Sequence, residues 1–182
     1  GNQPESSVAR RFYDTRFFLN KKAIVRKVKI KYTPWALTIK LTTGIKNTTI
    51  QSIYITTNGS LPDRILAFAE AVNKFDSNIE VNFQISIDDI PERHNAVRKV
   101  KNIFEDCIKS YRLIKNLNIP NITASASITV SHENCLNIKE IFYYLTEDCK
   151  IDSIKCCIVR DEGVYKTPKE KREQILNAYN WL

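Results

Sequence analysis

The sequence predicts an α/β protein built on a parallel sheet of βα repeats, and three observations predict it. From residue 50 onward, apolar β-branched segments typical of strands alternate with segments of helical periodicity. Two of these strands end in clusters of Thr, Asn, Ser or Asp. In parallel sheets, ligands bind at the carboxyl ends of the strands, where polar residues of this kind are found. A hydrophobic content of 43% is also sufficient for a substantial core.

Four strands are expected, with helical segments between them. They span residues 53–57, 81–87, 122–130 and 154–159. Parallel strands need crossover connections of this kind, and such crossovers are right-handed. Four βα units therefore predict an open parallel sheet or an incomplete barrel.

The expected helices carry apolar residues at intervals of three and four. The first begins near Ser60, a candidate N-cap, with Pro62 in its first turn. Two later helices are expected at residues 136–145 and 168–179. The clearest helix follows Pro91 and is predicted as one continuous element with a stripe of Val97, Val100, Phe104, Cys107, Tyr111 and Ile114. On that stripe Cys107 is interpreted as a core residue and not as a reactive thiol.

The excess of basic residues lies in one terminal stretch. Residues 1–49 contain 11 Lys/Arg and two acidic residues, whereas residues 50–182 contain 17 Lys/Arg and 18 Asp/Glu. We therefore divide the chain into a basic segment, 1–49, and a βα domain, 50–182. Alternation after Val28 and over residues 37–42 favours an edge hairpin, and the alternative is a basic arm for nucleic acid. The neutral βα domain argues against nucleic acid as a partner of the folded part.

The cysteines and the lack of long apolar runs indicate a cytoplasmic protein. Five scattered cysteines, an odd number, are typical of reduced thiols and not of a disulfide framework. No apolar run approaches the length of a membrane span, and no signal peptide is visible. Because the chain lacks methionine and starts with Gly1, we expect it to be a fragment of a longer protein.

Polar residues follow the first two expected strands directly. Thr57 ends the first strand and Asn58 follows it, and Ser86 lies at the end of the second strand with Asp88 directly after it. The carboxyl ends of parallel strands lie at one edge of a sheet, so these four residues are candidates for ligand binding. The alternative for Asp88 is a cap on the helix that follows it.

Four short motifs occur in order along residues 50–160. They are Thr57-Asn58-Gly59, Ser86-Ile87-Asp88, His94-Asn95-Ala96-Val97-Arg98 with Phe104-Glu105, and Thr129-Val130-Ser131 with Asn134. Together they resemble the third strand, the fourth strand, the following helix and the fifth strand of radical S-adenosylmethionine (radical SAM) domains. The resemblance implies an incomplete (βα)6 TIM-like barrel that holds S-adenosylmethionine at its strand ends.

The resemblance also implies roles for individual residues. Ser86 and Asp88 would lie near the ribose of S-adenosylmethionine, and Arg98 would face the carboxylate of its methionine moiety. A guanidinium suits that task because it pairs with a carboxylate through two hydrogen bonds. Thr57, Asn58 and Thr129 would line the cavity. For Arg98, the alternative is a solvated helix residue.

The chain departs from the family where the chemistry is carried out. Radical SAM enzymes hold a [4Fe-4S] cluster on three cysteines spaced Cys-x3-Cys-x2-Cys ahead of the second strand, and thiolates are the ligands of such clusters. The first cysteine here is Cys107. Asp89 and Lys99 also stand where the family has glycine, and Asn95 where it has aspartate. We expect the cluster, its reductant and the substrate to belong to an intact parent enzyme. We expect this chain itself to be inactive, either as a fragment or as a degenerate relative.

Two other functions remain open from the sequence. One is a non-catalytic α/β module whose basic arm binds nucleic acid. The other is a metal-dependent transferase that uses the adjacent carboxylates of Asp88 and Asp89 to hold a divalent ion beside a phosphate. The alternative for this pair is that the two carboxylates diverge and one caps the next helix. Of the two histidines, His94 begins an expected helix and His132 follows an expected strand, so both are placed near the candidate site.

Overall fold

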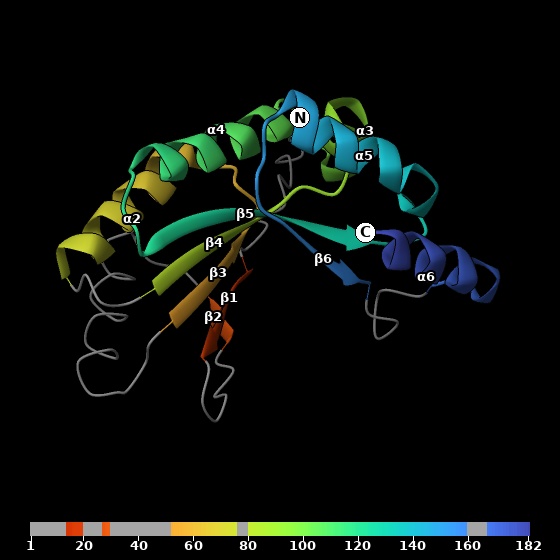
Figure 1. The fold of residues 1–182 in the computed structure, drawn as a ribbon, viewed down its shortest axis with the longest axis horizontal. Coiled ribbons are helices and arrows are strands. Elements are labelled where there is room, and N and C mark those ends of the chain that lie inside the picture. Colours follow the sequence, from red (N-terminus) through yellow and green to blue (C-terminus); the bar gives the residue numbers. More distant parts are fainter. Residues whose placement is uncertain (1–13, 20–26, 30–51, 76–79, 160–166) are drawn as a thin grey trace, which may run out of the picture.

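The computed structural model describes residues 14–19, 27–29, 52–75, 80–159 and 167–182. Six strands form one sheet in the order β2-β1-β3-β4-β5-β6 (Figure 1). Their bounds are β1 Asp14–Leu19, β2 Lys27–Lys29, β3 Ser52–Thr57, β4 Glu80–Ser86, β5 Ile122–Val130 and β6 Ile154–Ile158. The helices are α2 Pro62–Phe75, α3 Pro91–Arg98, α4 Ile103–Asn116, α5 Ile138–Tyr143 and α6 Arg172–Trp181.

The four strands β3 to β6 are parallel and lie side by side in chain order. This confirms the predicted parallel sheet of βα units, and each strand begins and ends within one residue of its expected bounds. The strands β1 and β2 extend the sheet beyond β3 as antiparallel neighbours. The expected strand at residues 37–42 lies outside the described residues.

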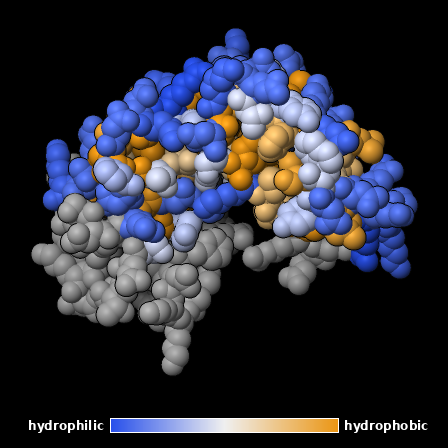
Figure 2. Space-filling model, viewed as in Figure 1, coloured by the Kyte–Doolittle hydropathy of each residue, from blue (hydrophilic) through white to orange (hydrophobic). Residues whose placement is uncertain are grey.

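The helices α2 to α5 lie on one side of the parallel strands, with α6 following β6 at the end of the layer (Figure 1). The side chains that the strands turn toward this layer are apolar and buried, for example Ile53 and Ile55 from β3 and Phe83 and Ile85 from β4. The outer surface of the helical layer is mainly hydrophilic, and hydrophobic side chains gather beneath it (Figure 2). Burial of this apolar face is the main contribution to the stability of the sheet.

The opposite face of the sheet is polar. Because side chains alternate along a strand, the residues between the buried ones all point away from the helices. They are Tyr54 and Thr56 from β3, Asn82, Gln84 and Ser86 from β4, Thr123, Ser125, Ser127 and Thr129 from β5, and Lys155 and Cys157 from β6. We call this set the polar face.

The prediction of one continuous helix after Pro91 is wrong. The structure has two helices, α3 and α4, separated by a turn in which Lys99 and Asn102 adopt positive φ values of 54° and 60°. Val97 and Val100, expected to be buried, are 53% and 45% exposed. The turn is stabilised by Asn95, whose side-chain oxygen accepts a hydrogen bond of 2.8 Å from the Phe104 N–H in the first turn of α4.

The remaining helices differ less from expectation. Pro62 is the first residue of α2, as predicted, and Cys107 is fully buried in the core. The helix expected at residues 136–145 consists of a 3-10 turn, α5 and a π-helical turn, with Leu136 exposed. No described helix is both long and apolar enough to cross a bilayer.

Candidate functional site

The carboxyl ends of β3, β4 and β5 bring most of the predicted residues to one edge of the sheet. Thr57 is level with Ile85 on β4, so Asn58 follows at the level of Ser86. Ser86 is level with Ser127 on β5, and Asp88 therefore reaches the level of Thr129. Ser86, Asp88 and Thr129 point to the same side, because their neighbours Ile85, Ile87, Ile128 and Val130 are buried against the helices.

Asp88 is the centre of a hydrogen-bond network at this edge. Its Oδ1 accepts a hydrogen bond of 2.9 Å from the Thr129 N–H, and its Oδ2 lies 2.5 Å from Nη2 of Arg98. Its backbone carbonyl accepts from Asn134 Nδ2 at 2.8 Å, and its N–H donates to His94 Nδ1 at 3.3 Å. Three predicted residues from three different elements are thus joined directly.

The ion pair of Asp88 and Arg98 is partly accessible to solvent, with 28% and 32% of the two side chains exposed. Oδ1 of Asp88 accepts from Thr129 and Oδ2 from Arg98, and each carboxylate oxygen has two lone pairs. The carboxylate therefore retains the capacity to accept hydrogen bonds from a ligand. Arg98 is part of a protein network and is not the solvated helix residue of the alternative interpretation.

Asn134 also belongs to this edge, although it was not among the predicted site residues. It is 3% exposed and ties the ends of β4 and β5 together. Its Nδ2 donates to the carbonyls of Asp88 and Thr129, and its Oδ1 accepts from the Ser131 N–H at 2.8 Å. The family motif contained this asparagine, but no strand or helix pattern in the sequence indicates which backbone groups it reaches.

His94 lies beneath Asp88 and is 2% exposed. Its Nδ1 accepts from the Asp88 N–H, and its Nε2 has no hydrogen-bond partner among the residues that the structure describes. Burial, together with the positive charge of Arg98, lowers the pKa of His94 to about 4. The imidazole is therefore neutral at pH 7 and serves as an acceptor for the backbone of Asp88.

The loop after β3 is held by its own side chains and by α4. Thr57 Oγ1 accepts from the Gly59 N–H, and Asn58 Oδ1 accepts from the N–H and hydroxyl of Ser60. Cys107 Sγ donates to the Asn58 carbonyl at 3.0 Å. Gly59 has a φ of 68°, and a Cβ built on it would lie 2.9 Å from the Cα of Cys107. Only glycine fits both the conformation and the space.

The predicted residues of this loop differ in position. Thr57 follows the buried Ile53 and Ile55 at even spacing, so its side chain lies on the helical side of the sheet and not on the polar face. Asn58 lies at the edge, with its amide nitrogen available for a further hydrogen bond. Ser86 is on the polar face, and its hydroxyl makes no hydrogen bond to any described residue.

Asp88 and Asp89 diverge. The Asp89 carboxylate is buried and accepts from the Ile90 N–H and from Arg93 Nε, whose Nη2 continues to Glu140 on α5. Within the described ranges, no three His, Cys, Asp or Glu side chains come together as metal ligands. The two carboxylates therefore diverge, as in the alternative interpretation. The expected cap is not formed, because the N-cap of α3 is Ile90 and no side chain makes a cap hydrogen bond there.

Comparisons with protein-family models, curated proteins and solved structures find no match. The geometry of the site therefore indicates what it can bind. The site consists of a partly exposed carboxylate–guanidinium pair, the hydroxyl of Ser86 and the amide of Asn58, all at the carboxyl edge of a parallel sheet. Groups of this kind bind a polar ligand through several hydrogen bonds, and the position is where α/β sheets bind ligands.

Proposed function

We propose that this chain is a radical SAM-like partial (βα)6 barrel that binds S-adenosylmethionine at the carboxyl edge of β3, β4 and β5. The main support for this proposal is the hydrogen-bond network centred on Asp88. It joins Asp88, Arg98 and Thr129, three residues that the resemblance assigns to one ligand. Sequential parallel strands with α2 to α5 on one side are also what a single-layered barrel requires (Figure 1).

Two backbone features support the resemblance independently. Gly59, the last residue of the Thr-Asn-Gly motif, occupies a position that excludes a Cβ. Lys99 stands where the family has glycine, and its φ of 54° is the left-handed conformation that glycine favours. The conformation expected of a glycine is therefore present at position 99 although the residue has changed.

In this proposal Asp88 and Ser86 bind the ribose hydroxyls of S-adenosylmethionine. Arg98 balances the charge of Asp88 and offers a cation to the carboxylate of the methionine moiety. Asn58 and Thr129 complete the lining on either side, whereas Thr57 acts through the loop that carries Asn58. His94 and Asn134 keep the Asp88 backbone in place.

A [4Fe-4S] cluster does not fit the described residues. Cys107, Cys135 and Cys149 are buried separately, burial raises the pKa of the Cys107 thiol to about 12, and all five cysteines are free. A cluster needs several accessible thiolates at one place. We therefore propose that this chain binds S-adenosylmethionine without cleaving it, and that the cluster and its reductant belong to an intact cytoplasmic parent.

Calorimetric titration of the full chain with S-adenosylmethionine tests the proposal. We expect saturable binding that Asp88→Asn weakens about tenfold or more, because a charge-assisted hydrogen bond to the ribose is lost. Ser86→Ala removes a hydroxyl that makes no hydrogen bond within the described part of the chain, and should weaken binding by roughly threefold to tenfold with the fold intact. The matched control is Asp63→Asn, which changes an exposed carboxylate on α2 that pairs with Lys109 and not with Asp88 or Arg98.

Absence of binding, or equal affinities for the wild type and Ser86→Ala, would overturn the proposal. Circular dichroism of Asp88→Asn separates loss of the site from loss of the fold. Titration with adenosine alone then tests the assignment of the ribose, since the Ser86→Ala effect should persist for a ligand that lacks the methionine moiety.

A further inference from the structure

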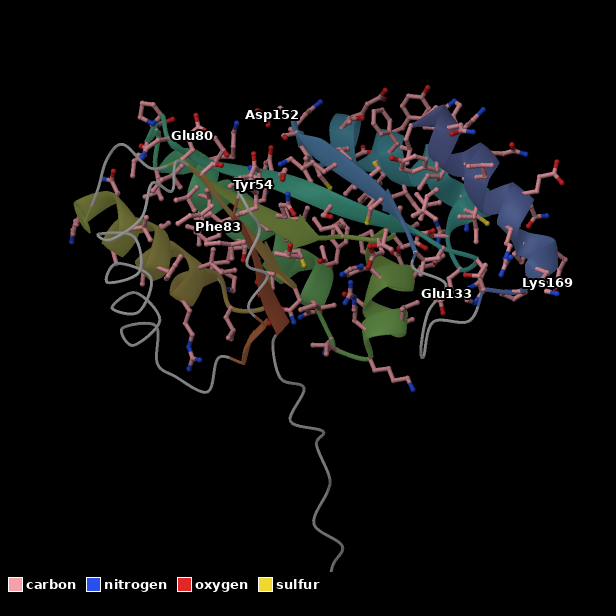
Figure 3. The ribbon with its side chains drawn as sticks, turned by 90° about the horizontal axis from the view of Figure 1, so that it is seen from below. Tyr54, Glu80, Phe83, Glu133, Asp152 and Lys169 are labelled. Carbon is pink, nitrogen blue, oxygen red and sulfur yellow. The ribbon has the colours of Figure 1, made fainter. Side chains whose placement is uncertain are left out.

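A hollow of about 410 Å³ opens at the amino ends of the parallel strands, opposite the edge that carries Asp88. Its lining comes from β3, β4, β5 and β6, from the segments that lead into β5 and β6, and from Lys115 near the end of α4. Figure 3 shows Tyr54, Glu80 and Asp152 gathered at this end of the sheet, away from Glu133, which follows the carboxyl end of β5. The polar face thus has a second candidate site.

Lys155 is the central charge of this hollow. Its Nζ donates to Asn82 Oδ1 at 3.0 Å and lies 4.7 Å from the centroid of the Tyr54 ring. The side chain is partly buried, and burial lowers the pKa of Lys155. Among the residues that the structure describes, no carboxylate forms an ion pair with it. A partly buried ammonium without a counter-charge is destabilising, and an anion from solution would relieve this cost.

The second lysine of the hollow is in a different situation. Lys115 Nζ lies 2.7 Å from Asp152 Oδ2, and the hydroxyl of Tyr111 donates to the other oxygen of the same carboxylate. This ammonium is therefore balanced within the protein. Glu80, at the start of β4, is exposed to solvent. The charge that still needs a partner in the described part of the hollow is Lys155.

The position of Lys155 is fixed by its neighbours. Asn82 Oδ1 also accepts from Ser125 Oγ at 3.1 Å, and Asn82 Nδ2 donates to Thr123 Oγ1 at 2.8 Å. Asn82 is therefore held on three sides and anchors Lys155 in one orientation. A cation that is held in place beside an open hollow loses little conformational entropy when a ligand binds.

We propose that this hollow binds a small anion, a carboxylate or a phosphate group, with Lys155 as its counter-charge and the surrounding hydroxyls as further donors. This inference is independent of the proposed S-adenosylmethionine site. It concerns binding and not catalysis, because the amino ends of parallel strands are not where sheets of this kind carry out chemistry.

Calorimetric titration of the full chain with inorganic phosphate and with malonate tests the proposal, with glycerol as the neutral probe. We expect binding of at least one anion and none of glycerol. Lys155→Gln retains a donor toward Asn82 but removes the charge, and should weaken anion binding roughly tenfold or more. Lys155→Arg should retain most of the affinity. The preferred anion, phosphate or malonate, identifies the group that the hollow recognises.

Lys101→Gln is the matched control, because it removes one exposed lysine outside the hollow. Equal affinities in wild type, Lys101→Gln and Lys155→Gln would mean that the anions bind through net charge, which overturns the proposal, as would absence of anion binding. Lys155→Gln should leave the binding of S-adenosylmethionine unchanged, so failure here and failure at the carboxyl edge are distinguishable. Circular dichroism confirms that each variant is folded.

Discussion

The two ends of the polar face differ in how their partly buried charges are balanced. At the carboxyl edge the Asp88 carboxylate has a guanidinium and a backbone N–H as partners, and Asn134 saturates the backbone around it. At the amino end Lys155 has an amide oxygen and an aromatic ring, but no carboxylate of the described residues. The first end is organised before any ligand arrives, whereas the second retains a charge that a ligand can balance.

Removal of Asn134 should have the largest effect on stability, because it breaks the carboxyl edge. In Asn134→Leu the carbonyls of Asp88 and Thr129 and the N–H of Ser131, all at partly buried positions, lose their partner. We expect the free energy of unfolding to fall by about 4 kcal/mol. Urea unfolding followed by circular dichroism measures the change.

Asn116→Leu is the control for this prediction. Asn116 is the exposed last residue of α4, and its replacement should change the free energy of unfolding by less than about 0.5 kcal/mol. If the two variants were equally stable, the network around Asp88 would not be the source of order at this edge.

Acid should weaken the carboxyl edge through His94. The pKa of His94 is lowered from 6.5 to about 4 by burial, so the unfolded chain takes up a proton before the folded protein does as the pH falls. The stability contributed by neutral His94 is complete above about pH 6.5 and is lost between there and about pH 4. Between pH 7.5 and pH 5 the free energy of unfolding should fall by roughly 2 kcal/mol.

His94→Asn tests the origin of this slope. Asparagine can accept from the Asp88 N–H through its Oδ1 but does not titrate, so the variant should lose most of the pH dependence between pH 7.5 and pH 5. His132→Asn, at the exposed second histidine, should retain it. An unchanged slope in His94→Asn would assign the pH dependence to other groups.

The smallest effect is expected at the amino end, and its direction is informative. Lys155→Met retains the apolar stem but removes the partly buried charge, so the free energy of unfolding should stay the same or rise by up to about 1 kcal/mol. Lys115→Met, which leaves Asp152 without its ammonium, should lower it slightly. If the free energy of unfolding fell by more than about 1 kcal/mol in Lys155→Met, Lys155 would be a residue that stabilises the fold and not one kept for a ligand.

The four parallel strands were predictable because their signal is local. Apolar β-branched segments indicated the strands, and the helical segments between them implied parallel neighbours. Residues of these segments such as Ile53, Phe83 and Ile128 are buried in the core. The motif positions Asp88, Arg98 and Thr129 also meet, since parallel strands in register bring their ends together.

The break between α3 and α4 was not predictable from periodicity. The apolar stripe continues through Val97 and Val100, but the turn depends on the contact of Asn95 with the Phe104 N–H and on left-handed backbone at Lys99 and Asn102. Such conformations are common for glycine and carry no signal at a lysine. The face on which Thr57 lies follows from strand alternation, which the motif alone does not consider.

The close approach of Gly59 to Cys107 has a consequence for tracing the ancestry of this chain. A Cβ at position 59 would lie against the Cα and Sγ of Cys107. We therefore expect relatives of this chain to keep small residues at both positions, even where the strands between them differ in sequence. A search for distant relatives that scores this coupled pair would follow a constraint set by space, and not one set by whichever chemistry each relative has kept or abandoned.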